Sequence, residues 1–455
     1  EVTFARGFGT LTPLGADPVT PTTLFQIGST TKMMTVTALL QKVEDGEVSL
    51  DATLAVALPE LEFALDGSWN DQIRVEHLIT HQGGFADHVD WEGSSDDAEL
   101  ADFTYGFFAD QLWLMNPPGA FWNYSNPNFS LAGLVTEEVD ERMWPDILVE
   151  DVLLPLGMDR TYLRKAEVEA DGDYAESWGW GSTADMAMHH VTMDDIGDAA
   201  WVRPAGMAWS TPSQMVRFGD FLMHGDQGVL DDALRAEMVA EQVNTLWYMD
   251  EMHYGYGVFV DRGMTDSLGR YHVTPVHEHG GNTLSFTSIL YALPEYDVAV
   301  SILSSGYGTS FHGTLEAALN AAIDLPDPVD APEYEFDPER LDDHVGTYLD
   351  PYNVGAIIIT REGDGLRIEM PELAGYGMDV DPDLVTISSD LFHVDIDGGL
   401  YDLTFIAADE GGPSTYLRNR SFIGIRAEEV ALTGDRAPVD RASIARALAP
   451  SPLSP

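Results

Sequence analysis

The sequence has no cysteine, very little lysine and few positive charges of any kind. The absence of cysteine from 455 residues excludes disulfides, thiolate metal sites and cysteine nucleophiles. Lysine occurs only at Lys32, Lys42 and Lys165. The 22 Lys and Arg residues stand against 77 Asp and Glu residues, which gives a formal net charge of -55. Such a chain repels polyanions, so nucleic acid and anionic membrane surfaces are poor candidates for partners.

Long hydrophobic runs and a signal-like N-terminus are also missing. No segment approaches the roughly 18 apolar residues of a membrane span, and the first residue is Glu1 rather than methionine, which favours a trimmed N-terminus. The acidic, lysine-poor composition predicts a halophilic or salt-exposed source, because about 1 M salt shortens the Debye length to about 3 Å and screens the self-repulsion. An ordinary acidic secreted protein is the alternative. We expect an extracellular or periplasmic location rather than a cytoplasmic one.

The hydrophobic content of 44% supports real cores, and the length predicts two or three domains. Residues 1–324 read as one large mixed α/β domain. It begins with a strand and turn over residues 2–14, and continues with a helix over 29–47 that Gly46 ends. Near the end of the domain, residues 275–283, 285–293 and 298–304 are β-like runs that predict an antiparallel meander.

A proline-rich, acidic segment over residues 325–338 predicts an extended linker. Residues 339–426 beyond it carry short alternating segments at regular spacing, which favour an all-β sandwich or barrel. These segments are 345–349, 356–360, 366–370, 384–388, 392–396, 401–407 and 421–426. Residues 427–455 are rich in alanine, proline and charge, and we expect an exposed helix or a loose tail.

The first candidate for chemistry is the S-x-x-K run that starts at Ser29. On a helix, the i, i+3 spacing places the Ser29 hydroxyl and the Lys32 amine on one face, where a nucleophile and its base would touch. The plain alternative is a capping serine followed by a solvated lysine. A chain that keeps three lysines favours the catalytic interpretation, because a lysine one turn after a serine is then unlikely to be chance.

Two further candidates follow along the chain. Tyr124, Ser125 and Asn126 precede a helical run and could relay protons, or could form a turn over a packed aromatic ring. His279, Gly280 and Gly281 lie on a strand, where residues without side chains would let a substrate backbone approach. The alternative for the glycines is a bulge or turn.

Together, in this order and spacing, the three motifs resemble the serine β-lactamase and penicillin-binding-protein superfamily. The likeness is closest to the class C β-lactamase-like branch, which includes esterases and D-amino-acid peptidases. It covers roughly residues 1–323 and extends to the segments 25–32 (FQIGSTTK), 75–84 (VEHLITHQGG), 122–133 (WNYSNPNFSLAG), 204–218 (PAGMAWSTPSQMVRF) and 277–286 (HEHGGNTLSF).

The resemblance implies an α+β β-lactamase-like catalytic domain with a central antiparallel sheet and a helical subdomain. The β-rich segment is similar to the small lipocalin-like barrel that is often appended in this branch. Relatives usually carry a helix and an edge strand ahead of the segment that resembles residues 2–9, so we expect that these elements were either cut away or left unobserved. Close relatives with a barrel can oligomerise, which allows a homo-oligomer here.

The same resemblance implies roles for particular residues. Ser29 would be the acylated nucleophile, Lys32 its base partner, Tyr124 the proton relay and Asn126 a donor to the substrate. His279, Gly280 and Gly281 take the third motif position. The backbone N–H groups of Ser29 and Asn282 would form the oxyanion hole. The implied reaction is acyl transfer in two halves, formation of an acyl-enzyme and its hydrolysis, with no cofactor.

The third motif departs from true β-lactamases, which usually have lysine where this chain has His279. A largely neutral histidine supplies no fixed charge for a substrate carboxylate, so we expect small esters, amides or peptides as substrates. A β-lactamase proper, a D-amino-acid or DD-peptidase, and a catalytically inactive penicillin-binding-like protein are the alternatives. A metal hydrolase is disfavoured, because the pairs His189–His190 and His277–His279 lack an evident third ligand and no H-E-x-x-H run occurs.

The net charge places a condition on this chemistry. Lys32 must be neutral to act as a base, whereas the field of the surrounding carboxylates favours its charged form. Burial must therefore outweigh that field. Salt would favour the neutral form of Lys32, because it screens the distant carboxylates and does not affect the buried neighbours of Lys32. We expect activity to rise with salt from low ionic strength.

Overall fold

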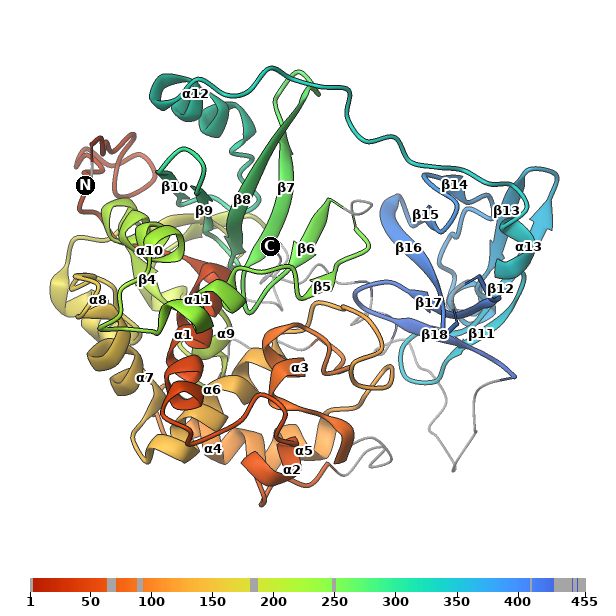
Figure 1. The fold of residues 1–455 in the computed structure, drawn as a ribbon, viewed down its shortest axis with the longest axis horizontal. Helices are drawn as coiled ribbons and strands as arrows, with labels where there is room; N and C mark the ends of the chain where they lie inside the picture. Colours follow the sequence, from red (N-terminus) through yellow and green to blue (C-terminus); the bar gives the residue numbers. More distant parts are fainter. Residues whose placement is uncertain are drawn as a thin grey trace.

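The computed structural model describes residues 3–63, 71–87, 93–180, 187–247, 251–409 and 411–428, together with residues 444 and 448. Figure 1 shows a larger part built of helices around an antiparallel sheet, and a smaller β part drawn in blue beside it. An extended stretch after residue 322 passes over the top of the view and joins the two. The predicted combination of an α/β domain and a small barrel is confirmed.

Apart from α12, the helices of the larger part lie mainly on one side of its sheet (Figure 1). The longest three are α1 (Thr31–Glu44), α6 (Pro127–Asp140) and α10 (Pro212–His224). Between them lie short helices, which are α2 (Leu54–Ala57), α3 (Val75–Ile79), α4 (Glu99–Phe103), α5 (Ala109–Gln111), α7 (Trp144–Ile147), α8 (Lys165–Asp171), α9 (Arg203–Gly206) and α11 (Asp232–Met238), with π-helical turns η3 (Thr104–Phe108) and η4 (Leu148–Leu153). Within the described ranges, every helix is too short or too polar to reach across a bilayer.

The main sheet has six antiparallel strands in the order β10-β9-β8-β7-β6-β5. The strands are β5 (Val243–Asn244), β6 (Met252–Tyr254), β7 (Phe259–Thr265), β8 (Tyr271–Asn282), β9 (Thr287–Leu293) and β10 (Val298–Ser304). The last three are the predicted meander. Helix α10 packs on β9 and β10, while α12 (His312–Ala322) covers the other face with Leu315 and Leu319 against Val276 and Leu293.

Smaller strand pairs complete the larger part. β1 (Phe25–Gln26) pairs with β4 (Trp209–Ser210), and β2 (Ser177–Gly179) pairs with β3 (His189–Val191). The strand predicted over residues 2–14 is wrong, because the only pairing described there is an isolated bridge between Thr10 and Pro18. This segment carries apolar residues at alternate positions near its start, but no strand in the described part of the chain pairs with it.

Helix α1 is the buried centre of the larger part. It contacts α6, α9 and η4, and eleven of its fourteen residues are buried. Ser29 lies just before it in a 3-10 turn, η1 (Gly28–Thr30), so the regular helix starts two residues later than predicted. Gly46, with a φ of +74°, follows its last residues as predicted.

The smaller part is an eight-stranded antiparallel sheet in the order β13-β12-β11-β18-β17-β16-β15-β14. Its strands are β11 (Gly346–Asp350), β12 (Gly355–Glu362), β13 (Gly365–Glu369), β14 (Val385–Thr386), β15 (Leu391–Ile396), β16 (Gly399–Ala407), β17 (Ser414–Arg418) and β18 (Ile423–Arg426), with short helices α13 (Leu341–His344) and α14 (Pro371–Gly375). Backbone bonds from Ile368 N to Pro382 O and from Leu384 N to Leu366 O nearly close the sheet into a barrel. The likeness of this barrel to lipocalins stays a prediction.

Two features of the barrel differ from the sequence interpretation. Strand β17 was not anticipated, because Ser-Thr-Tyr-Leu-Arg carries one aliphatic residue and shows no clear alternation. Ile444, which was expected in an exposed or loose tail, is 1% exposed and belongs to the barrel core. Leu448 packs against the same core, and its carbonyl accepts a hydrogen bond from Tyr401. The other residues after 428 lie outside the described ranges.

Two carboxylic acids lie close together on adjacent strands of the main sheet, where Asp261 is buried and Glu278 is partly buried. The register of β7 and β8 places Asp261 and Glu278 on one face, two residues apart along the ladder. Burial raises the pKa of Asp261 to about 8, and the charge of Glu251 acts in the same direction. Burial and the neighbouring Asp261 likewise raise the pKa of Glu278. The fold therefore favours the protonated acids.

Replacing Asp261 with asparagine should change how stability depends on pH. Because the folded protein holds a proton that the unfolded chain releases near its ordinary pKa of about 3.9, the free energy of unfolding falls as pH rises from about 4 to about 8. Asp261→Asn cannot ionise, so we expect it to raise that free energy by about 1 kcal/mol or more at pH 8. Urea unfolding at pH 5 and pH 8 measures the effect.

The exposed Asp364→Asn is the matched control, because it removes the same formal charge from an exposed position. Equal stabilisation in both variants at both pH values would show that general charge repulsion, and not the buried acid, is responsible.

Candidate active site

Ser29 and Lys32 lie together in the interior, where helix α1 begins. Both residues are 0% exposed, and Lys32 Nζ is 3.1 Å from Ser29 Oγ. The turn η1 precedes the helix, so the serine lies at its N-terminal end and the lysine points back along the first turn. The structure thus brings the predicted nucleophile and base within hydrogen-bond distance.

The surroundings of the Lys32 amine suit its neutral form. Nζ donates to Asn126 Oδ1 at 2.7 Å and to the Ala205 carbonyl at 2.6 Å, and its third neighbour is Ser29 Oγ. A neutral amine has two N–H groups and one lone pair. The two carbonyl oxygens take the two hydrogens, which leaves the lone pair facing a hydroxyl that can donate.

The pKa of Lys32 is held well below its usual value, and burial is the main cause. The carboxylate of Asp87 acts against this shift, and the guanidinium of Arg420 acts with it. The other two lysines have different tasks. Lys42 is ion-paired with Asp140, and Lys165 donates to the Ile196 carbonyl.

Tyr124 closes one side of the site. It is 0% exposed, and Lys32 Nζ lies 5.0 Å from the centre of its ring. Burial raises the pKa of its phenol, while the charge of Arg420 and the nearby Ser29 hydroxyl act in the opposite direction. The His81 ring packs on it at 4.0 Å between centroids. A phenol held protonated here is suited to give a proton to a leaving group.

Asn126 links the base to a carboxylate. Its side-chain oxygen accepts from Lys32, while its backbone N–H and its Nδ2 both donate to Asp87 Oδ1, at 2.9 and 3.0 Å. The neighbouring Ser125 is buried, and its backbone N–H donates to His81 Nδ1. The predicted Y-S-N segment therefore lies at the N-terminus of α6 and contacts Lys32 through its asparagine.

His279 is a neutral, fully buried member of the same cluster. Its Nδ1 donates to the Gly280 carbonyl at 2.5 Å, and its Nε2 accepts from the Tyr254 hydroxyl at 3.2 Å. Burial and the neighbouring Lys32 lower its pKa to about 3. The third motif position therefore carries no positive charge near neutral pH.

The two glycines after His279 lie at the end of β8. A Cβ on Gly281 would lie 2.1 Å from the Ile27 carbonyl oxygen, so this glycine permits close contact between two backbones. Gly28 has a φ of +53°, and a Cβ there would lie 2.8 Å from Asn282 N. The end of β8 therefore places the backbone amide of Asn282 next to Gly28, the residue before Ser29. An oxyanion hole from the N–H groups of Ser29 and Asn282 stays a prediction.

Three residues that sequence reasoning missed belong to this cluster: His81, Asp87 and Arg420. His81 lies in the segment 75–84 that supports the resemblance, although no role was assigned to it, and Asp87 stands in no motif with recognisable spacing. Arg420 comes from the barrel, after β17, and its guanidinium carbon lies 4.4 Å above the Tyr124 ring. The scarcity of positive charge that drew attention to Lys32 also applies to Arg418 and Arg420, two cations within three residues.

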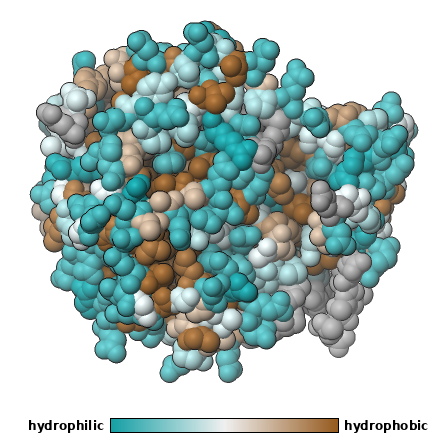
Figure 2. Space-filling model, viewed as in Figure 1, coloured by the Kyte–Doolittle hydropathy of each residue, from teal (hydrophilic) through white to brown (hydrophobic). Residues whose placement is uncertain are grey.

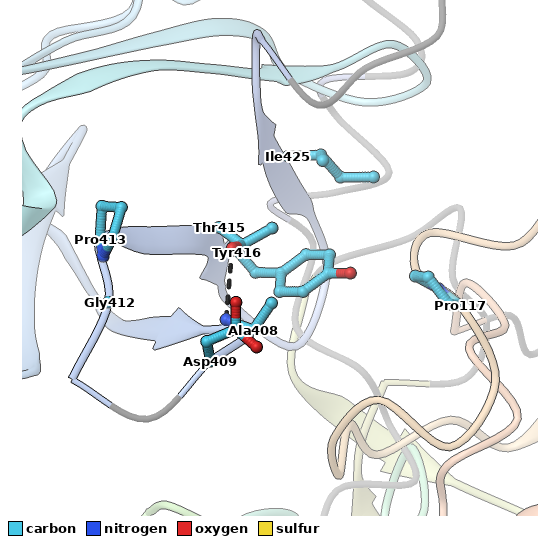
Figure 3. A pocket seen from close by; sticks show the side chains of 8 residues that line it. All are labelled: Pro117, Ala408, Asp409, Gly412, Pro413, Thr415, Tyr416 and Ile425. Atoms are coloured by element: carbon cyan, nitrogen blue, oxygen red, sulfur yellow. Dashed lines mark hydrogen bonds between the residues drawn. The ribbon is translucent and has the colours of Figure 1, made fainter.

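A separate cavity of about 370 Å³ lies where the barrel approaches the larger part. Figure 3 shows Tyr416 and Ile425 of the barrel turned towards Pro117 across it, and Thr415 beside Ala408. None of the motif residues lines this cavity. It is distinct from the cluster around Ser29.

The histidine pairs considered as metal ligands have other surroundings. His190 is paired with Glu176 at 2.6 Å, and His277 is largely buried and forms no ion pair with any described residue. Among the described residues, one group has metal-like spacing: Asp220, His224 and Asp297. All three are exposed, on α10 and on the turn before β10, and none belongs to the cluster around Ser29.

Comparisons with known proteins agree with this arrangement. A family model described as Beta-lactamase matches residues 1–324. Penicillin-binding protein 4 of Amycolatopsis lactamdurans is 26% identical over 353 residues, which cover 72% of this chain and 85% of that protein. Protein flp of Staphylococcus aureus is 27% identical over 155 residues, or 34% of this chain. That match spans 30% of the flp protein, about a third of its length.

Solved structures show the same fold over nearly the whole chain. The octameric penicillin-binding protein homologue from Pyrococcus abyssi is 20% identical with a TM-score of 0.58, and the match covers 94% of this chain and 93% of that one. A D-amino acid amidase from Ochrobactrum anthropi, complexed with L-phenylalanine amide, is 22% identical with a TM-score of 0.55 and covers 68% and 86%. With its S-x-x-K pair placed at the start of a buried helix, this chain belongs to the Beta-lactamase family.

Proposed function

We propose that this protein is a serine hydrolase that cleaves small esters, amides or peptides through an acyl-enzyme. The observation that carries the proposal is the buried Lys32 amine, which lies 3.1 Å from Ser29 Oγ and contacts two carbonyl oxygens. When the amine is neutral, these two oxygens take its hydrogens and its lone pair faces Ser29 Oγ. An amine in this state can take the serine proton at neutral pH, which a solvated lysine cannot do.

The reaction proceeds in two halves. Ser29 Oγ attacks the substrate carbonyl carbon while its proton passes to Lys32, and the carbonyl oxygen becomes an oxyanion facing the N–H groups of Ser29 and Asn282. The leaving group departs with a proton from Tyr124, which recovers it from Lys32. A water molecule then attacks the acyl-enzyme, gives a proton back through the same groups, and releases the acid and free Ser29.

The neutral His279 supports uncharged acyl groups over carboxylate-bearing β-lactams. Its pKa of about 3 means that no cation stands at the third motif position at neutral pH. The amidase and penicillin-binding names among the relatives favour amide bonds next to D-amino acids as a second candidate. A β-lactamase proper has less support, because Arg420 is the cation nearest to Tyr124 and is already paired with Asp87.

A substrate panel with Ser29→Ala tests the proposal. The panel contains p-nitrophenyl esters, D- and L-aminoacyl anilides and a chromogenic cephalosporin, each run in high salt. We expect wild type to turn over at least one ester or anilide and Ser29→Ala to lose at least about 10³-fold in kcat, because no other group can form the acyl-enzyme.

The exposed Ser49→Ala is the matched control and should keep wild-type turnover. Full activity in Ser29→Ala, or loss of activity with a chelator while a fluorophosphonate has no effect, would contradict serine chemistry.

Activity should also respond to salt. The face drawn in Figure 2 is mostly hydrophilic. Because the formal charge is -55, distant carboxylates favour the charged form of Lys32. Salt screens those distant charges but leaves Asp87, 9% exposed at its side chain, largely unaffected. We therefore expect kcat/KM at fixed pH to rise several-fold between about 10 mM and about 1 M NaCl, as the Debye length falls from about 30 to about 3 Å.

Circular dichroism at each salt concentration is the control, because loss of folded protein in dilute buffer would imitate the effect. A kcat/KM that stays constant while the protein remains folded at every concentration would exclude the field of the distant carboxylates as an influence on Lys32.

A further inference from the structure

The barrel reaches into the candidate active site through the segment after β17. Arg418 is 1% exposed and donates to the carbonyls of Trp122, at 2.8 Å, and Thr245, at 2.7 Å, in the larger part. Asn123 Nδ2 in turn donates to the Arg420 carbonyl at 3.1 Å. These bonds fix the segment against the residues that lead into Tyr124.

Arg420 then continues into a chain of polar contacts that ends at the base. Its Nη2 is 2.8 Å from Asp87 Oδ2. The other oxygen of Asp87 accepts both bonds from Asn126, and Asn126 Oδ1 accepts from Lys32. The side chains of Arg420 and Asp87 are 13% and 9% exposed, so water screens this chain of contacts little.

Asp87 and Arg420 are the charged groups that face Lys32. The other titratable groups around it are neutral near pH 7 among the described residues: burial lowers the pKa of His81 and His279, and raises the pKa of Tyr124 and Tyr254. A buried carboxylate facing the amine by itself would favour the charged lysine, which cannot act as a base. A cation beside that carboxylate cancels most of its field.

We propose that Arg420 is a positioning residue supplied by the barrel, which offsets the charge of Asp87 and so lets Lys32 stay a neutral base. The inference rests on the proposed serine chemistry. The barrel would then contribute to catalysis. The Asp87 carboxylate holds Asn126 in position, and Arg420 of the barrel offsets the tendency of that negative charge to favour protonated Lys32.

The test measures how the reactivity of Ser29 depends on pH, and needs no knowledge of the natural substrate. A fluorophosphonate probe reacts with Ser29: an oxygen–phosphorus bond forms, the phosphorus–fluorine bond breaks, fluoride leaves and the hydroxyl proton passes to Lys32. The labelling rate falls on the acid side, where Lys32 becomes protonated. Intact-protein mass spectrometry follows the rate in the full-length chain from pH 5 to pH 10.

The acid limb is the part of the pH profile in which the labelling rate falls as Lys32 becomes protonated. The two single variants should move the midpoint of this limb in opposite directions along the pH scale. In Arg420→Gln, Asp87 acts without opposition, and we expect the limb to move to higher pH by about one unit, which slows labelling about tenfold on the limb. In Asp87→Asn, Arg420 acts alone and the limb should move to lower pH. In the double variant, both charges are gone and the limb should return close to that of wild type.

Three comparisons keep the result interpretable. Arg420→Lys retains the charge and should keep the wild-type limb, whereas Arg367→Gln, which removes an arginine at the far side of the barrel, should have no effect. If Arg420→Gln does not fold by circular dichroism, Asp87→Asn alone decides through the direction of its shift. An unchanged limb in folded Arg420→Gln, or equal slowing at all pH values, overturns the inference.

The two proposals fail in distinguishable ways. Absence of labelling at Ser29 in wild type at every pH would contradict the serine chemistry itself. Labelling in wild type whose acid limb is the same in Arg420→Gln, Asp87→Asn and the double variant would leave the serine chemistry in place and remove the role of the barrel.

Discussion

The structure depends on one amine that is kept out of water. Lys32 is fully buried in a chain that carries a large excess of negative charge, and its nitrogen touches two carbonyl oxygens and one hydroxyl. Burial of an ammonium ion in such a place is costly, so the neutral amine is favoured. The helices around α1, the glycine contact at Gly28 and the end of β8 all serve to hold this amine and the serine hydroxyl together.

The excess of carboxylates and the buried base are compatible because they occupy different places. The acidic side chains lie mostly on the surface, where water and salt screen them, and several of those near the interior are paired with arginine, as Asp97 is with Arg164 and Arg203. Asp87 also has an arginine partner, but it differs from the other acidic residues because it lies close enough to Lys32 to influence the pKa of that amine directly. Its ion pair with Arg420 is therefore of more consequence than the many pairs at the surface.

The barrel and the larger part form one functional unit at this point. Arg418 donates to the backbone carbonyls of Trp122 and Thr245, two buried residues of the other part. Burial lowers its pKa to about 10, so it stays charged at neutral pH. The fold likeness to the Pyrococcus abyssi homologue covers 94% of this chain.

The sequence by itself determined the family, the S-x-x-K pair, strands β8 to β10 and seven of the eight barrel strands. These depend on local patterns: a serine and a lysine three residues apart share a helix face, and alternating residues mark barrel strands such as β12 and β15. It did not mark β1 to β6, which are only two or three residues long, nor β7, whose centre is Asp-Arg-Gly. It also missed β17, whose residues lack that alternation, and Ile444, whose burial depends on a distant core. Only the tertiary structure decided that Asp87 and Arg420 stand beside Lys32. Those residues are separated by up to 388 positions along the chain, and no local pattern records a contact whose energy comes from burial and charge in three dimensions.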